Sequence, residues 1–230
     1  MPLIDVVAVS HSYFSGSGRR QVLTDISVEL SEPRIGVIGA NGSGKSTFAR
    51  LLNGLVLPDS GQVRVAGHDT RRDGRAVRRL VGFCFTDPDA QIVMPTVRED
   101  IGFGLRRRGL APADIAARVE RALTDFGLAD HADHPAHLLS GGQKQLLALA
   151  AVLVTEPALL IMDEPTTLLD LRNAAAVGRI VAELSQQVIL VTHHLELLAG
   201  FDRVLVFDEG RLVCDDLPAA AGAHYRQRVR

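Results

Sequence analysis

Gly39-Ala-Asn-Gly-Ser-Gly-Lys-Ser-Thr47 decides the fold of this 230-residue chain. The stretch follows an apolar run, Ile35–Ile38, and precedes Phe48–Leu52, which has a helical pattern, so the order is strand, glycine turn, helix. The glycines allow backbone N–H groups to turn inward around a polyphosphate, and the helix begins with its positive end facing the anion. A glycine turn that caps an ordinary helix is the alternative. The complete G-x4-G-K-S spacing favours a nucleoside triphosphate site.

The side chains of this predicted phosphate-binding loop have separate tasks. Lys45 can reach the β- and γ-phosphates, and the hydroxyl of Ser46 can take one position around Mg²⁺. We therefore expect ATP and Mg²⁺ as ligands. The residues expected to contact the nucleotide here are Gly39, Asn41, Gly42, Ser43, Gly44, Lys45, Ser46 and Thr47.

Composition narrows the class of protein. A hydrophobic content of 47% suits a buried core, but no apolar run approaches the ~20 residues of a membrane span. No export signal marks the N-terminus. Cys84 lies in an apolar run and is expected to be a free, buried thiol, which together with the low cysteine count indicates a reducing cytosol.

Apolar runs and turn residues predict an α/β chain with a helical insertion. Short β-type runs on both sides of Ser15–Gly18 indicate a hairpin or small antiparallel sheet. Continuously apolar strands at 158–162 and 188–191, separated by helices, indicate a parallel sheet covered on both faces, and 204–213 reads as a terminal hairpin. The predicted division of a single domain is 1–85 and 141–230 for the β subdomain and α/β core, and 86–140 for an α-helical subdomain.

The Arg106–Arg108 run raises the possibility of nucleic-acid binding. From Arg98 to Asp130, however, six arginines are matched by six acidic residues, and the net charge of the whole chain is −2. A solvated helix end is therefore the better interpretation, and no nucleic-acid partner is predicted.

Leu159-Leu-Ile-Met-Asp-Glu164 places two carboxylates at the end of a predicted buried strand. Asp163 suits Mg²⁺, usually through water, and Glu164 suits the polarisation of an attacking water molecule. An apolar run that ends in Asp-Glu is common by itself. Its combination with the phosphate-binding loop is what gives it weight.

The segment Leu139-Ser-Gly-Gly-Gln143 directly precedes a long helical pattern and is called the signature segment from here on. The Ser140 hydroxyl and the N–H groups of Gly141 and Gly142 would meet at a positive helix terminus and form a second anion site. A plain helix cap is the alternative, and it explains Ser140 but not both glycines together with Gln143.

These motifs together resemble the ATP-binding cassette (ABC) ATPases, over essentially the whole chain. The resemblance implies a P-loop fold with a RecA-like core, and ATP sites completed only in a head-to-tail dimer, in which the signature segment of one subunit faces the phosphate-binding loop of the other. It also implies that Tyr13 stacks on adenine and that Leu169-Asp170 contacts the partner subunit. His193 is expected to contact the γ-phosphate, and the expected catalytic residues are Lys45, Glu164 and His193.

Structural alternatives exist for the aromatic and histidine assignments. Tyr13 can be a packed surface tyrosine, His193 a capped loop histidine, and His194 is interpreted as structural. Three histidines before the signature segment suggest a metal site, but no cysteine or acidic ligand set accompanies them. They are His131, His134 and His137.

Pro88-Asp-Ala-Gln91, followed by Pro95-Thr-Val97 and Glu99-Asp100, resembles the energy-coupling-factor (ECF) ATPases. The sequences of Thr86–Asp89 and Val93–Val97 are most similar to those of the ATPase subunits of biotin transporters. The resemblance implies a transmembrane T subunit and a substrate-binding membrane subunit as partners, a homodimer or a pseudo-dimer with a second ATPase, and a position on the cytoplasmic face of the membrane.

Thr86 occupies the position where this family usually has the Q-loop glutamine. We expected Thr86 to be too short to reach the metal without a bridging water, and Gln91 to serve coupling to the membrane subunit. Cobalt or nickel ECF importers and conventional ABC importers are the alternatives within transport. A soluble ABC protein acting on DNA or ribosomes is the alternative outside it.

Overall fold

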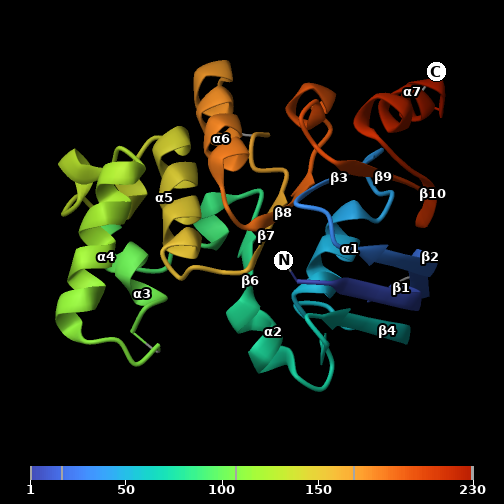
Figure 1. Cartoon of the computed structure of the whole chain (residues 1–230), viewed down its shortest axis with the longest axis horizontal. Coiled ribbons are helices and arrows are strands. Elements are labelled where there is room, and N and C mark those ends of the chain that lie inside the picture. The colour runs from blue at the N-terminus through green and yellow to red at the C-terminus, as the bar shows by residue number, and fades with distance from the viewer. Residues whose placement is uncertain (1, 17, 107, 168, 229–230) are drawn as a thin grey trace. The chain divides into compact units, whose positions relative to one another are not determined.

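The computed structural model describes residues 2–16, 18–106, 108–167 and 169–228, which form two compact units (Figure 1). The first unit comprises Met1–Val81, Ala158–Asp163 and Leu184–Arg230, and the second comprises Gly82–Pro157 and Glu164–Glu183. Residue 17 of the predicted glycine-serine turn and residue 107 of the arginine run lie outside the described residues. No helix within the described ranges is long and apolar enough to cross a membrane.

An antiparallel sheet opens the first unit, as the sequence predicted. Its strands are β1 (Ile4–Ser15), β2 (Gly18–Leu30), β4 (Ser60–Val65) and β5 (His68–Asp69), in the order β2-β1-β4-β5, and Figure 1 shows the first three side by side. Ile4 faces Leu30 on one side and Val65 on the other, and all three are completely buried. Alternation of buried and exposed residues along β2 and β4 gives this sheet one apolar face.

The second sheet of this unit carries the glycine turn. Five of its strands lie in the order β10-β9-β3-β8-β7, and β3 pairs in parallel with both β8 and β9. Every residue of β7 and β8 is buried, as expected for strands covered on both faces. The strands are β3 (Arg34–Gly39), β7 (Leu159–Asp163), β8 (Gln187–Val191), β9 (Arg203–Asp208) and β10 (Arg211–Asp216).

The described residues of the first unit form three α-helices, α1 (Lys45–Leu52), α2 (Gly74–Leu80) and α7 (Pro218–Arg228), and the short 3-10 helix η4 (Leu195–Leu198). The sequence analysis predicted α1 but assigned no structure after the terminal hairpin, so it missed α7. A proline at the first helical position, followed by three alanines, is the signal that would have indicated this helix.

The second unit has a helical core. Its elements are β6 (Val81–Cys84), which starts at the boundary, η1 (Pro88–Ala90), α3 (Val97–Phe103), α4 (Pro112–Asp125), η2 (Ala129–His131), η3 (Ala136–Leu138), α5 (Gly141–Leu153) and α6 (Leu171–Glu183). Leu147, Ala150 and Val154 share a buried cluster with apolar residues of α3 and α4. Because α5 supplies part of that core, the unit extends beyond residue 140, where the sequence analysis placed the end of the helical subdomain.

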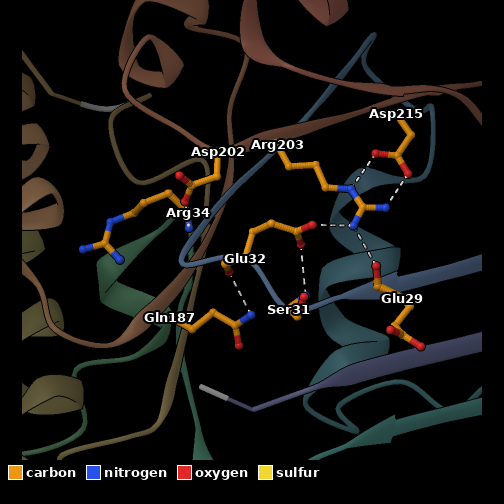
Figure 2. A network of polar contacts seen from close by, with 8 residues as sticks. All are labelled: Glu29, Ser31, Glu32, Arg34, Gln187, Asp202, Arg203 and Asp215. Carbon is orange, nitrogen blue, oxygen red and sulfur yellow. Dashed lines mark hydrogen bonds and ion pairs between the residues drawn. The ribbon is translucent and has the colours of Figure 1, made fainter.

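Arg203 links three parts of the first unit (Figure 2). Its guanidinium donates to both carboxylate oxygens of Asp215 at 2.6 Å, to Glu32 at 2.9 Å and to the backbone carbonyl of Glu29 at 2.8 Å. The Glu32 carbonyl in turn accepts from the Gln187 side chain at 2.9 Å. The network therefore fastens the loop between β2 and β3 to the second sheet.

The same network sets the ionisation of Glu32. Burial alone would raise the pKa of Glu32, but hydrogen bonds from the N–H of Ser31, from its own N–H and from Arg203 outweigh that effect and hold the pKa below its ordinary value of 4.5. A lowered folded-state pKa means that this carboxylate stabilises the fold at neutral pH. That contribution is lost as the pH falls through the folded-state pKa.

We predict that Glu32→Gln lowers the melting temperature at pH 7 by about 2–4 °C, because a partly exposed ion pair is worth up to about 1 kcal/mol. The difference from the wild type should shrink as the pH falls below about 4. Glu29→Gln is the matched control, since only the backbone carbonyl of Glu29 takes part in the network. A difference that stayed constant down to about pH 3 would contradict this role for the carboxylate.

Candidate functional site

The turn after β3 has a backbone that only glycine adopts easily. Gly39, Gly42 and Gly44 have φ values of 150°, 80° and 101°, in the region that L side chains rarely occupy. The turn closes on itself through a hydrogen bond from Ser43 N to Ala40 O at 3.1 Å, and the N–H of Gly210 donates to Ser43 O at the same distance. Gly44 is then the N-cap of α1. This is the strand, turn and helix that the sequence predicted.

Ser43 gives the clearest indication that the turn binds a ligand. Its side chain is 3% exposed, and its Oγ has no hydrogen-bond partner among the described residues. Buried hydroxyls in native structures are normally paired. An anion held by the turn would supply the missing acceptor.

Lys45 is buried at the start of α1, and its Nζ donates to the carbonyls of Gly39 and Ala40 at 2.8 and 2.9 Å. The ammonium group is thus held on the inner side of the turn. A phosphate group placed in the turn would meet this positive charge at short range.

Ser46 and Asp163 lie together. Ser46 Oγ donates to Asp163 Oδ1 at 2.8 Å, and Asp163 is 1% exposed at the end of β7. A hydroxyl and a carboxylate in contact are oxygen ligands of the kind that Mg²⁺ takes, so these side chains fit that ion. Arg50 Nη2, 3.6 Å from Asp163 Oδ2, is a site residue that the sequence analysis missed. Its i+4 spacing from Ser46 on a helix was the available signal.

Tyr13 and Thr47 also meet, with 3.4 Å between their hydroxyl oxygens. Tyr13 is 40% exposed, so part of its ring is accessible for stacking. The ring of His11 packs edge-on against it, with centroids 4.7 Å apart.

Asn41 is exposed in the turn. His193 follows β8 and stacks on His194, with ring centroids 4.1 Å apart.

The second unit contains the signature segment, which forms a capping box. Ser140 Oγ accepts from Gln143 N at 3.3 Å, and Ser140 N donates to Gln143 Oε1 at 2.9 Å. A cap therefore explains Gln143 as well as Ser140, contrary to our expectation. A Cβ at Gly142 would collide with the Asn173 side chain, which explains that glycine structurally too. Gly141 is exposed as the first residue of α5.

Glu164 has a left-handed backbone, with φ of 52°, and its Oε2 accepts from the Thr167 hydroxyl at 3.2 Å. Non-glycine residues held at positive φ are concentrated at functional sites. In the same unit Asp170 Oδ1 accepts from Asn173 N at 2.8 Å, so the predicted Leu169-Asp170 contact segment leads directly into α6. The neighbouring residue 168 lies outside the described ranges.

The side-chain amide of Gln91 forms hydrogen bonds within the second unit. The amide accepts from Phe85 N at 3.2 Å and donates to Ala148 O at 2.9 Å. It therefore joins the start of the segment Phe85–Val97, called the ECF-like segment from here on, to α5. It also hydrogen-bonds Cys84, whose pKa burial raises to about 12, so this thiol stays protonated and inert. These internal bonds do not test the predicted coupling of Gln91 to a membrane subunit, which stays a prediction. Any coupling role of Gln91 must act through the segment it positions.

Asp100 organises the rest of the ECF-like segment. Burial raises its pKa, although its Oδ1 accepts from the N–H groups of Val93 and Met94, both at 2.9 Å. Thr96 caps α3, and its hydroxyl also contacts Glu99 at 2.9 Å. Val93 remains 63% exposed on the segment that these bonds hold in place.

The three histidines considered for a metal site differ in their contacts. His131 and His134 contact one another, and His131 also contacts Gln143, whereas the contacts found for these two do not include His137. Within the described residues no three His, Cys, Asp or Glu side chains are arranged to hold a metal.

Comparison with known proteins gives a consistent family. A family model described as ABC transporter matches residues 23–167. The biotin transport ATP-binding protein BioM of Rhizobium etli is 54% identical over 210 residues, which are 91% of this chain and 93% of that protein. The energy-coupling factor transporter ATP-binding protein EcfA1 of Caldanaerobacter subterraneus is 40% identical over 218 residues, covering 91% and 79%.

Among solved structures, cbiO1 from Clostridium perfringens, described as part of the ABC transporter complex cbiONQ, is similar with a TM-score of 0.82. It is 31% identical, and the match covers 98% of this chain and 93% of that one. The similarity confirms the predicted fold class.

We predict that Gly44→Ala damages the turn more than Gly42→Ala. Both changes force an L side chain into a left-handed backbone, at a cost of about 1–2 kcal/mol. At Gly44 the new Cβ would also lie 2.6 Å from Leu23 Cδ2 and 2.8 Å from Val22 O, whereas at Gly42 the nearest atom is 4.0 Å away. Denaturant unfolding should therefore show an additional loss of about 1–3 kcal/mol for Gly44→Ala. Equal losses in the two variants would contradict the packing described for the turn.

Proposed function

The chain belongs to the ABC transporter family, and from that premise we propose that it is the ATP-hydrolysing subunit of an ECF-type importer that takes up biotin. The observation that carries the proposal is the 54% identity to a biotin transport ATP-binding protein over 91% of the chain. The ECF-type assembly is further supported by the 40% identity to an energy-coupling factor ATPase.

The proposed chemistry is in-line attack of water on the γ-phosphate of ATP. Lys45 holds the β- and γ-phosphates, and the turn from Gly39 to Gly44 surrounds them with backbone N–H groups. Ser46 and Asp163 are the residues that would hold Mg²⁺, which neutralises phosphate charge when bound. Glu164 orients the attacking water and accepts its proton, and His193 contacts the γ-phosphate.

The remaining donors come, in this proposal, from a second subunit. Ser140, Gly141 and Gly142 of one chain supply a hydroxyl and helix N-terminal N–H groups to the γ-phosphate bound by the other. The same arrangement can form with an identical chain or with a second ATPase of the transporter. Tyr13 stacks on the adenine of the nucleotide held by its own phosphate-binding loop.

The proposed membrane partners are a transmembrane T subunit and a substrate-binding subunit, which place this chain on the cytoplasmic face of the membrane. The ECF-like segment, Phe85–Val97, is the proposed contact with the T subunit. In the structure this segment is held by Gln91 from one end and by Asp100 from the other, and Val93 is exposed between them.

Isolation of the transporter with its membrane subunits, followed by reconstitution into vesicles, tests this function. ATP-dependent uptake of labelled biotin is the expected result. Uptake of Co²⁺ or Ni²⁺ instead would overturn the biotin assignment and favour the metal-importing alternative. If no membrane protein copurified with the chain, the assignment to an importer would be contradicted.

In the same vesicles we predict that Glu164→Gln lowers ATP turnover and biotin uptake at least about hundredfold, because the water loses its general base. Nucleotide affinity should change little, since Lys45 and the turn are intact. Glu156→Gln is the matched control, because Glu156 is in the same unit and has the same φ of 52°. Turnover of Glu164→Gln at the wild-type rate would remove Glu164 from the catalytic assignment.

We also predict that Ser140→Arg blocks hydrolysis while the isolated subunit still binds nucleotide, because the added bulk and charge lie where the partner's γ-phosphate should rest. Mixing this variant with Lys45→Ala should restore part of the activity, since one site of a mixed dimer then has both native halves. Once mixed dimers and independent sites have been demonstrated, an absence of recovered ATPase activity would contradict the shared-site arrangement.

A further inference from the structure

Both the oxygen and the nitrogen of the Gln143 side-chain amide form hydrogen bonds. Its Oε1 accepts from the backbone N–H of Ser140 at 2.9 Å, and its Nε2 lies 2.8 Å from Nε2 of His131. His131 Nδ1 lies 3.0 Å from Nδ1 of His134. The four residues form one chain of hydrogen bonds that ends at the cap of α5, referred to below as the histidine chain.

The direction of every bond in the histidine chain follows from its two ends. A backbone N–H can only donate, so the amide oxygen of Gln143 faces Ser140 and the NH₂ group faces His131. That NH₂ group can only donate, so His131 Nε2 accepts and carries no proton. The ring proton of His131 is therefore on Nδ1, and it is donated to Nδ1 of His134.

From this geometry we propose that His131 and His134 are positioning residues for the signature segment, and that they hold Gln143 only while both imidazoles are neutral. An additional proton on His131 must go to Nε2, where it meets the NH₂ group of Gln143. An additional proton on His134 must go to Nδ1, where it meets the Nδ1–H of His131. Either proton places two donors opposite each other and breaks one bond of the histidine chain.

Acidic side chains outnumber basic ones on the loop that carries the two histidines and on the helices next to it, and several of them form ion pairs. Asp133 accepts from Arg98 Nε at 3.1 Å, and Arg98 also pairs with Glu120. Lys144 pairs with Asp89 at 2.7 Å. The bond directions in the histidine chain are fixed by its two ends and do not depend on these charges. Besides His131 and His134, the titratable and charged groups on this loop and on η1, α3, α4 and α5 are Asp89, Arg98, Glu99, Asp100, Asp114, Arg118, Glu120, Arg121, Asp125, Asp130, Asp133, His137 and Lys144.

The consequence for the reaction rests on the function proposed above for the signature segment. Ser140 is oriented by the bond from its N–H to Gln143, so a Gln143 that has lost His131 holds Ser140 less firmly. The effect should appear in kcat, because the signature segment acts on the γ-phosphate of the partner. Nucleotide affinity of the isolated subunit should not change, because the phosphate-binding loop belongs to the other unit.

Long-range proton–nitrogen NMR on the nucleotide-free wild-type subunit tests the histidine chain without reference to ATP hydrolysis. At pH about 8, where imidazole is largely neutral, we expect His131 as the Nδ1–H tautomer and His134 as the Nε2–H tautomer. Detection of His131 as the Nε2–H tautomer would overturn the inference, because Gln143 could not then donate to it.

The pH dependence of ATPase activity tests the positioning role. His131→Gln places a carbonyl oxygen where Nε2 accepts, and that group does not titrate in this range. Between pH about 8 and about 5.5 the wild type should lose about fivefold more kcat than His131→Gln, the loss expected for one hydrogen bond. His131→Ala should be about fivefold slower than the wild type at pH 8, with unchanged KM for ATP.

His137→Gln is the matched control, because it removes a histidine of the same loop without touching the histidine chain, and it should keep the wild-type profile. Superimposable profiles for His131→Gln and the wild type would overturn the positioning role. A wild-type protein without ATPase activity would overturn the proposed function instead, and the tautomer measurement would still decide whether the histidine chain exists.

Discussion

The hydrogen bond between Ser46 and Asp163 is the interaction on which the arrangement of the first unit depends. It joins residues 117 positions apart, and its acceptor is a carboxylate with only 1% exposure. A buried carboxylate is costly unless donors surround it. Ser46 and Arg50 both come from α1, which begins at Lys45 after the glycine turn that follows β3. The parallel order β3-β8-β7 then brings the carboxyl ends of β3 and β7 to the same edge of the sheet.

Much of this arrangement could be predicted from the sequence, because the determining signals are local. The glycine spacing of residues 39–44 has to satisfy a backbone of positive φ, and no other residue type satisfies it as cheaply. The continuously apolar runs that became β7 and β8 indicated burial on both faces. Asp163 could be placed at the end of its strand because the apolar run Leu159–Met162 stops at the first of two carboxylates.

Interactions between distant side chains were less accessible to sequence reasoning. Gln91 was interpreted by its position in a motif, but its bonds to Phe85 and Ala148 depend on how the segment lies against α5. The contact between His131 and Gln143 depends in the same way on the path of the loop before η3. Arg50 was overlooked for a different reason: its partner Asp163 is close only once the parallel sheet has formed.

The signature segment shows why a structural and a functional interpretation of one residue need not exclude each other. The capping box satisfies the N–H groups of Ser140 and Gln143, and it uses the Ser140 hydroxyl only as an acceptor. The capping box does not use the hydrogen of that hydroxyl. The first N–H groups of α5 also stay available, because the first turn of a helix has no internal acceptors for them. A rigid cap therefore presents its remaining donors in a fixed direction. If Gln143 were absent, the same donors would be present but less well oriented, and for an anion that must be bound most tightly in the transition state, orientation is the property that counts.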